Sequence, residues 1–182
     1  MKEKHPVEVG EARLSTGIPG LDNVLCGGLD GERLYLIEGE PGTGKTTLAL
    51  QFLLEGARRG EKVLYVTLSE SERELQLVAK RHGWSLDDIS VFELVPPEAA
   101  LDPEKELTLF HPSELELTET SKLIFDKVAQ VNPSRVVFDS LSEMRLLAQQ
   151  SLRYRRQILA LKHFFGGRRC TVLLLDDLSS NQ

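Results

Sequence analysis

The chain contains only two cysteines among its 182 residues, and they stand far apart, at Cys26 and Cys170. They lack the short spacing of a metal site, and the first residues, Met1 to Pro6, lack the apolar stretch of a secretion signal. We therefore expect two reduced thiols in a cytoplasmic protein. No apolar run approaches the roughly 20 residues of a membrane-spanning helix, so we expect no membrane segment.

Excess positive charge is also missing, because the formal net charge is −6. Proteins that coat nucleic acids neutralise phosphates with lysine and arginine, so we expect no nucleic-acid partner. One region is locally basic, and there we favour a solvated helix face or a subunit contact over a DNA groove. Its basic residues are Arg153, Arg155, Arg156, Lys162, Arg168 and Arg169. The histidines show no ligand pattern and receive no role: His5, His82, His111 and His163.

A phosphate-binding loop is present. The strand-like run Leu34 to Glu38 leads into Gly39 to Thr46, which reads GEPGTGKT and fits the pattern GxxxxGKT. Glycines let backbone N–H groups turn towards an anion, and the helix that follows adds the positive end of its dipole. Lys45 would reach the β- and γ-phosphates, and Thr46 would hold Mg²⁺. The residues expected around the phosphates are Glu40, Pro41, Gly42, Thr43, Gly44, Lys45, Thr46 and Thr47.

Five short apolar runs alternate with segments of helical period, which is typical of a parallel sheet covered by helices on both faces. The predicted strands are 34–38, 63–68, 91–94, 135–138 and 171–175. The predicted helices are 46–59, 72–82, 118–131 and 151–165, the second opened by a capping box between Ser71 and Glu74. Prolines and acidic residues over 96–116 predict a long surface loop. The length suits one α/β domain over 1–182.

Two carboxylates follow predicted strands and are candidates for chemistry. Asp139 ends the buried run that starts at Arg135, so it would lie near the Mg²⁺ held by Thr46, as a Walker B aspartate. It could also cap a following helix, and both roles are compatible. Glu70 follows the second strand and is the preferred base for activating water, with Glu72 as second choice. Against both stands the general preference of acidic residues for helix N-termini.

Two further carboxylates, Asp176 and Asp177, end the last apolar run, again at the edge where ligands bind in open α/β sheets. One of them could sense the γ-phosphate or Mg²⁺ through water. Only their position supports this interpretation.

Three blocks with fixed spacing resemble the amino-terminal half of the KaiC and RadA branch of the RecA-type ATPases. They are Leu14 to Asp22 (LSTGIPGLD), Gly27 to Leu29, and Gly39 to Phe52. The segment Tyr65 to Glu70 is similar to the one that carries two adjacent catalytic glutamates in this family, and Val136 to Ser140 is similar to its Walker B strand. The resemblance covers about residues 13–177 and is closer to KaiC-like proteins than to the recombinases.

This resemblance implies a three-layer RecA-type P-loop core that binds ATP with Mg²⁺ at a subunit interface of a homo-oligomer, in the family often a ring of six. It implies catalytic roles for Lys45 and Glu70 and metal ligation by Thr46 and Asp139. Two features depart from the family. Ser69 stands where the first glutamate would be, and the chain ends soon after the strand that finishes at Leu175. The family continues with further strands whose basic residues reach the neighbouring γ-phosphate, so we expect a truncated or naturally short form.

The leading functional hypothesis is a Mg²⁺-dependent ATPase of KaiC-like type. A second is an autokinase that transfers the γ-phosphate to a serine or threonine of the protein itself, as in clock proteins, although those carry two such domains. A third is a switch in which ATP binding drives assembly or a signalling interaction without hydrolysis. Recombinase activity comes last, because the chain is acidic and has no evident DNA-binding loop.

Overall fold

Five parallel strands form a single sheet in the order β1-β5-β4-β2-β3. The computed structural model describes residues 13–94 and 113–178, so His5, His111 and most of the predicted loop at 96–116 lie outside the described residues. The parallel sheet predicted from the sequence is confirmed. Its strands are β1 (Leu34–Gly39), β2 (Val63–Thr67), β3 (Ser90–Glu93), β4 (Arg135–Asp139) and β5 (Thr171–Asp177).

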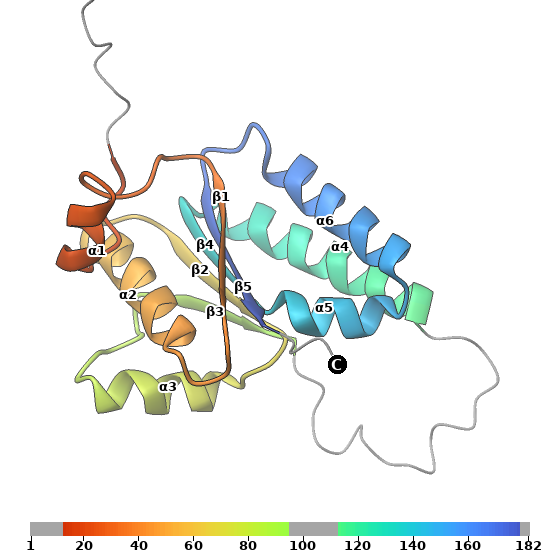
Figure 1. Cartoon of the computed structure of the whole chain (residues 1–182), viewed down its shortest axis with the longest axis horizontal. Coiled ribbons are helices and arrows are strands. Elements are labelled where there is room, and N and C mark those ends of the chain that lie inside the picture. Colours follow the sequence, from red (N-terminus) through yellow and green to blue (C-terminus); the bar gives the residue numbers. More distant parts are fainter. Residues whose placement is uncertain (1–12, 95–112, 179–182) are drawn as a thin grey trace, which may run out of the picture.

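Helices cover both faces of the sheet, which gives the predicted three-layer α/β fold (Figure 1). One face carries α2 (Lys45–Arg58) and α3 (Glu72–Arg81), with the short α1 (Pro19–Val24) beside α2. The other carries α4 (Ser113–Val131), α5 (Leu141–Ala148) and α6 (Ser151–Phe165). The capping box of α3 is present: Glu74 N–H donates to the Ser71 hydroxyl, and Ser71 N–H donates to the Glu74 carboxylate.

Three helical features differ from the sequence prediction. The fourth helix begins at Ser113 rather than at 118, so the predicted loop cannot extend to 116. A separate α5 follows Asp139, with Leu141, Met144 and Ala148 buried three and four residues apart. The short α1 buries none of its residues, so it has no apolar period from which to be predicted.

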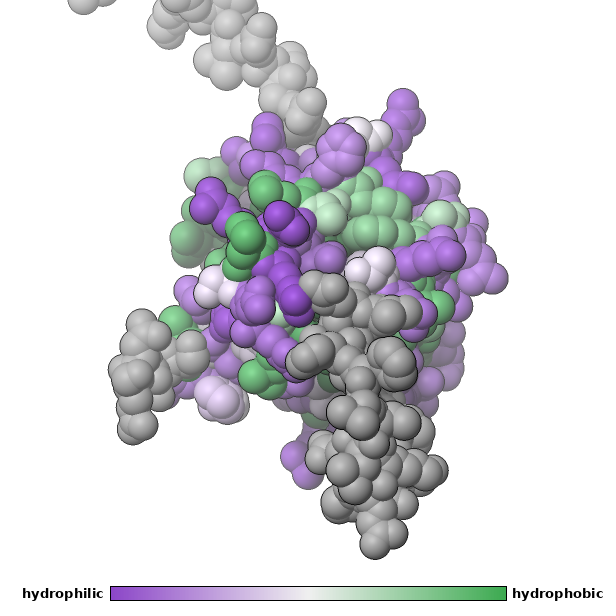
Figure 2. Space-filling view, turned by 90° about the vertical axis from the view of Figure 1, so that its right-hand side faces the viewer, coloured by the Kyte–Doolittle hydropathy of each residue, from purple (hydrophilic) through white to green (hydrophobic). Residues whose placement is uncertain are grey.

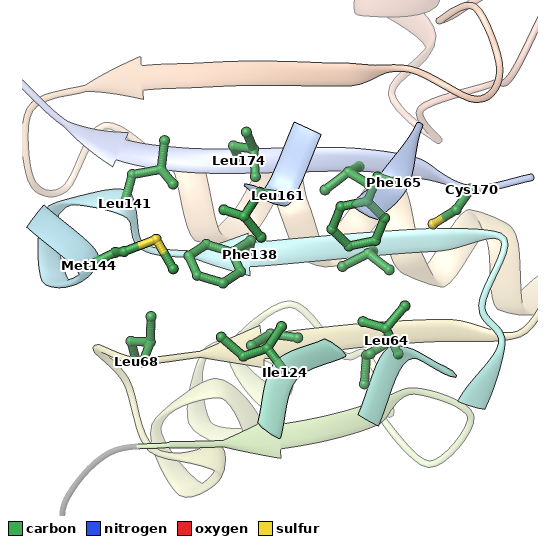
Figure 3. Close-up of a cluster of buried hydrophobic side chains, with 14 of the residues drawn as sticks. Leu64, Leu68, Ile124, Phe138, Leu141, Met144, Leu161, Phe165, Cys170 and Leu174 are labelled. Carbon is green, nitrogen blue, oxygen red and sulfur yellow. The ribbon is translucent and has the colours of Figure 1, made fainter. Parts of the chain in front are cut away.

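The two faces of the sheet bury two apolar clusters. Successive residues of a strand point to opposite faces, so in β2 Leu64 and Val66 join one cluster while Val63 and Tyr65 join the other. The cluster under α4, α5 and α6 is drawn in Figure 3 and includes the buried Cys170, whereas Cys26 is exposed. The strands β2 and β4 are buried along their whole length, which is typical of strands in the middle of a parallel sheet.

The side of the molecule turned towards the viewer in Figure 2 is mainly hydrophilic, with separate hydrophobic patches. Among the basic residues near 150–170, four are exposed: Arg155, Arg156, Lys162 and Arg169. Arg168 is half-buried, with its guanidinium 4.2 Å from the centre of the Phe164 ring. No helix in the described parts of the chain combines the length and hydrophobicity required to cross a membrane.

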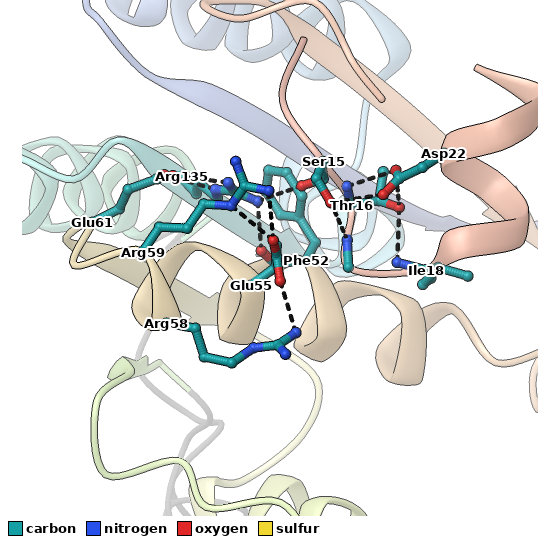
Figure 4. Close-up of polar contacts among 11 residues, drawn as sticks. Ser15, Thr16, Ile18, Asp22, Phe52, Glu55, Arg58, Arg59, Glu61 and Arg135 are labelled. Atoms are coloured by element: carbon teal, nitrogen blue, oxygen red, sulfur yellow. Dashed lines mark hydrogen bonds and ion pairs between the residues drawn. The ribbon is translucent and has the colours of Figure 1, made fainter. Parts of the chain in front are cut away.

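Arg135 is a fully buried cation at the start of β4. Its guanidinium forms two hydrogen bonds of 2.7 and 2.8 Å with the Glu61 carboxylate (Figure 4). It also donates to the carbonyl oxygens of Ser15 and Phe52, at 2.7 and 3.0 Å. Such a charge can be buried only because its donors are paired. Arg135 therefore ties the amino end of β4 to α2 and to the segment before α1.

The segment before α1 is in turn built around Asp22. The Asp22 carboxylate accepts hydrogen bonds from the hydroxyls of Ser15 and Thr16 and from Thr16 N–H, all between 2.7 and 2.8 Å (Figure 4). In the described structure, the block Leu14 to Asp22 therefore stabilises the fold through hydrogen bonds to Asp22 and Arg135. It does not line the pocket above the phosphate loop.

We predict that Arg135→Met lowers the free energy of unfolding by about 3 kcal/mol or more, because it leaves the Glu61 carboxylate and the carbonyl oxygens of Ser15 and Phe52 without their donor. The matched control is Arg58→Met, since Arg58 pairs with Glu55 but its side chain is 69% exposed. That change should cost less than about 1 kcal/mol. Urea unfolding followed by circular dichroism measures both. Equal losses in the two variants would contradict the role assigned to Arg135.

Candidate functional site

The loop between β1 and α2 has the backbone of an anion-binding turn. Gly42 and Gly44 adopt φ of +82° and +93°, a conformation that other residues rarely adopt. Gly44 is also the N-cap of α2, and no side chain caps the helix there. The first N–H groups of α2 and its positive dipole end are therefore available to a negatively charged group.

Lys45 is the cation of this loop. Its ammonium group donates to the carbonyl oxygens of Gly39 and Glu40, at 2.8 and 2.9 Å, and forms an ion pair of 2.8 Å with Asp177. The lysine side chain is only 12% exposed. Lys45 is thus held over the loop by contacts from both β1 and the end of β5.

A pocket of about 320 Å³ opens above the loop, at the carboxyl ends of the strands. Six of the eight residues predicted to surround phosphates line it, and so do Glu70, Asp139 and Asp177. Glu40 and Thr43 do not belong to its lining. The Thr43 hydroxyl donates instead to the Glu40 carbonyl at 2.8 Å, which closes the turn internally.

Asp139 lies at the end of β4, and only 6% of it is exposed. One carboxylate oxygen accepts a hydrogen bond of 2.6 Å from the Tyr65 hydroxyl, and the other accepts one of 3.2 Å from the Ser69 hydroxyl. Burial raises the pKa of Asp139, while these two hydrogen bonds and the charge of Lys45 counteract the increase. Burial and the Asp139 charge also raise the pKa of Tyr65 well above its usual value, so the phenol remains a donor.

Glu70 is placed by a turn that Thr67 organises. The buried Thr67 hydroxyl accepts from Glu70 N–H at 2.9 Å and donates to the Glu70 carbonyl at 2.7 Å. Burial and then the neighbouring Asp139 charge raise the pKa of Glu70. Its Oε2 atom is buried and has no hydrogen-bond partner among the described residues. Such an atom is suited to receive a proton or a donor from a bound molecule.

Glu72, the second choice for a base, is exposed on the first turn of α3. Its carboxylate accepts from the Gln76 side chain at 3.3 Å, and it does not line the pocket. Of the two glutamates, the structure brings only Glu70 to Lys45, Thr46 and Asp139.

The adjacent carboxylates Asp176 and Asp177 face opposite sides of the sheet. Asp177 lines the pocket and pairs with Lys45. Asp176 is buried beside α5, where it accepts from the Ser142 hydroxyl and from Arg145, both at 2.6 Å. Sequence position alone could not separate the two, because the alternation of side chains along a strand depends on its register.

The donors around Thr46 fit a magnesium ion bound together with phosphates. Mg²⁺ prefers oxygen ligands, and proteins usually hold it through one or two carboxylates, waters and substrate phosphates. The Thr46 hydroxyl and the Asp139 carboxylate line the same pocket and supply oxygen donors of this type. Within residues 13–94 and 113–178, no group of three or more histidine, cysteine, aspartate or glutamate side chains is placed to hold a metal ion by itself.

The sequence interpretation gave no individual role to Tyr65, Thr67 or Ser69. Their roles depend on contacts across the sheet, such as the register that pairs Thr67 with Asp139. A signal was available in part, because a tyrosine and a threonine in a buried strand need hydrogen-bond partners.

The chain is similar to known proteins. A family model described as "ATPase: KaiC" matches residues 14–182. The UPF0273 protein PH0284 of Pyrococcus horikoshii is 30% identical over 172 residues, which span 92% of this chain and 69% of that protein. A UPF0273 protein of Thermotoga maritima is 31% identical over 176 residues, with coverages of 92% and 70%.

Two further similarities involve KaiC by name. The circadian clock oscillator protein KaiC of Picosynechococcus is 33% identical over 133 residues, which span 73% of this chain but 24% of the clock protein. The crystal structure of the KaiC-like protein PH0186 of Pyrococcus horikoshii superposes with a TM-score of 0.74 at 26% identity. That match covers 93% of this chain and 72% of the other.

The ion pair between Lys45 and Asp177 yields a prediction. A phosphate group that approaches Lys45 must compete with the Asp177 carboxylate, which is also repelled by the phosphate charge. We expect Asp177→Asn to tighten ATP binding about two- to fivefold, as measured by isothermal titration calorimetry, because a partly exposed ion pair contributes up to about 1 kcal/mol. Asp176→Asn, on the other face, should not tighten it. Weaker ATP binding by Asp177→Asn would instead make Asp177 a favourable part of the site.

Proposed function

The chain belongs to the KaiC family of ATPases, and we propose that it binds ATP with Mg²⁺ in the pocket above the phosphate loop. The observation that carries this proposal is the convergence of Lys45, Thr46, Asp139 and Glu70 on one pocket, from the ends of β2 and β4 and the first turn of α2. In open α/β sheets ligands bind at this edge. The choice of ATP over other nucleotides is inferred from membership of this family.

Each group has a distinct part in the proposed binding. Backbone N–H groups of Gly42 to Thr46 and the N-terminus of α2 would hold the phosphate oxygens. Lys45 would exchange its contact with Asp177 for the β- and γ-phosphates. Thr46 and Asp139 would hold Mg²⁺, which neutralises charge on the phosphates.

We predict that Lys45→Ala weakens ATP binding about a hundredfold or more, because the phosphates lose the largely buried ammonium group that lines the pocket. Isothermal titration calorimetry with Mg²⁺ and ATP measures this, with Lys62→Ala as a control at an exposed lysine. Unchanged ATP affinity in Lys45→Ala would refute the proposed site.

For hydrolysis, we propose Glu70 as the base that orients and deprotonates water. The pKa of Glu70 is raised towards neutral pH, and a carboxylate with a higher pKa accepts a proton more readily. Its buried oxygen without a partner leaves one acceptor free among the described residues. Ser69 contributes a hydroxyl that donates to Asp139, where the family has a second glutamate. The reaction would therefore depend on one carboxylate.

We predict that Glu70→Gln keeps ATP affinity within about twofold and lowers turnover about 10²- to 10⁴-fold, because the amide cannot accept the proton of water. Release of phosphate under saturating ATP measures turnover. Glu72→Gln is the matched control and should retain it. Normal turnover by Glu70→Gln, or its loss in Glu72→Gln, would show that the base is assigned wrongly.

Two alternatives start from the same nucleotide site. Transfer of the γ-phosphate to a serine or threonine of the protein would make it an autokinase, and binding without cleavage would make it a switch for assembly or a partner. Incubation with γ-labelled ATP separates them. Free phosphate supports hydrolysis, and label on the protein supports the kinase. Intact ATP, together with a larger mass of the protein by light scattering, supports the switch.

The remaining proposals concern assembly. Family resemblance favours a homo-oligomer, such as a ring of six, in which a neighbouring subunit completes the site. Light scattering with and without Mg²⁺ and ATP tests this. The cytoplasmic location stays a prediction of the sequence.

A further inference from the structure

Tyr65 contacts Asp139, one of the two residues proposed to hold Mg²⁺. It is fully buried in the middle of β2, where the register pairs it with Val137 of β4, two residues before Asp139. Its side chain reaches along the sheet to the carboxyl edge, and its hydroxyl donates to Asp139 Oδ2 at 2.6 Å. The Tyr65 phenol therefore joins the middle of β2 to the carboxyl end of β4.

The bond from Tyr65 is the stronger of the two that orient Asp139. A carboxylate with 6% exposure needs donors to remain charged. Ser69 also donates to Asp139, but at 3.2 Å and from an exposed residue, so its hydroxyl can turn towards water. The Tyr65 hydroxyl has a shorter bond, and its ring is fixed in the apolar cluster with Val137 and Leu173. Asp139 therefore has one rigid donor and one adjustable donor.

We propose that Tyr65 is a positioning residue of the magnesium site. It holds the Asp139 carboxylate in the orientation that presents an oxygen to the ion. This inference rests on the proposed function. It differs from a purely structural role in one respect: loss of the Tyr65 hydroxyl must weaken the response to Mg²⁺ more than nucleotide binding in its absence. Outer-shell partners that orient metal ligands have effects of this kind.

The test compares Tyr65→Phe with Tyr35→Phe. Tyr35 lies on β1, and its hydroxyl bonds only to the backbone of Asp30 among the described residues, at 2.9 and 3.1 Å. Both changes remove one hydrogen-bonded hydroxyl from a strand tyrosine. Binding of a fluorescent ATP analogue is measured in EDTA and then during a Mg²⁺ titration, and the melting temperature of each variant is recorded without nucleotide.

In Tyr65→Phe, we expect the Mg²⁺ concentration for half-maximal response to rise about tenfold. Its affinity for the analogue in EDTA should stay within about twofold of the wild type, as expected when nucleotide contacts are retained. Tyr35→Phe should leave both values unchanged. A wild-type Mg²⁺ response in Tyr65→Phe would overturn the inference, and so would an equal loss of binding with and without Mg²⁺. A wild-type protein that binds no nucleotide would instead refute the proposed function, and the inference with it.

A second measurement serves if Tyr65→Phe does not fold. The chain has three tyrosines, so fluorotyrosine incorporation gives three ¹⁹F NMR signals, which Tyr35→Phe and Tyr154→Phe assign by elimination. Addition of Mg²⁺ to the nucleotide-bound protein should shift the Tyr65 signal and leave the Tyr35 signal in place. A Tyr65 signal that does not respond would overturn the inference.

Discussion

The parallel hydrogen bonding of the sheet is the constraint on which the site depends. Because all five strands run in one direction, the ends of β1, β2, β4 and β5 meet at a single edge, and each ends in or before a polar residue. The register sets Thr67 beside Asp139 and Glu38 beside Asp176. A slip of one residue in β4 or β5 would turn Asp139 or Asp177 towards the opposite face. The packing of the two apolar clusters therefore fixes the chemistry of the pocket.

Much of the fold could be predicted from the sequence because its signals are local. The phosphate loop is read from eight consecutive residues, and the strands are short apolar runs that end within two residues of their predicted limits. The capping box of α3 involves residues three apart. Short helices were harder: α1 has no buried face, and α5 spans only eight residues. Their positions depend on the rest of the molecule.

The supporting contacts of the site could not be predicted for the same reason. Tyr65 and Asp139 are 74 residues apart, and so are Glu61 and Arg135. Each pair meets only because β2 and β4 are neighbours in the sheet. Arg135 reads as one polar residue before an apolar run, although it is fully buried. Asp176 and Asp177 are indistinguishable in sequence, yet one binds α5 and the other binds Lys45.

The contact between Arg135 and the carbonyl oxygen of Ser15 has a consequence for where the folding unit begins. The hydroxyls of Ser15 and Thr16 also donate to Asp22, so the segment from Ser15 to Asp22 is linked to β4 through the buried Arg135 guanidinium. Removal of Ser15 would take away one acceptor of the Arg135 guanidinium, at the far end of the strand that carries Asp139. The minimal unit that can support the pocket thus starts before Ser15, some thirty residues ahead of the lysine it serves.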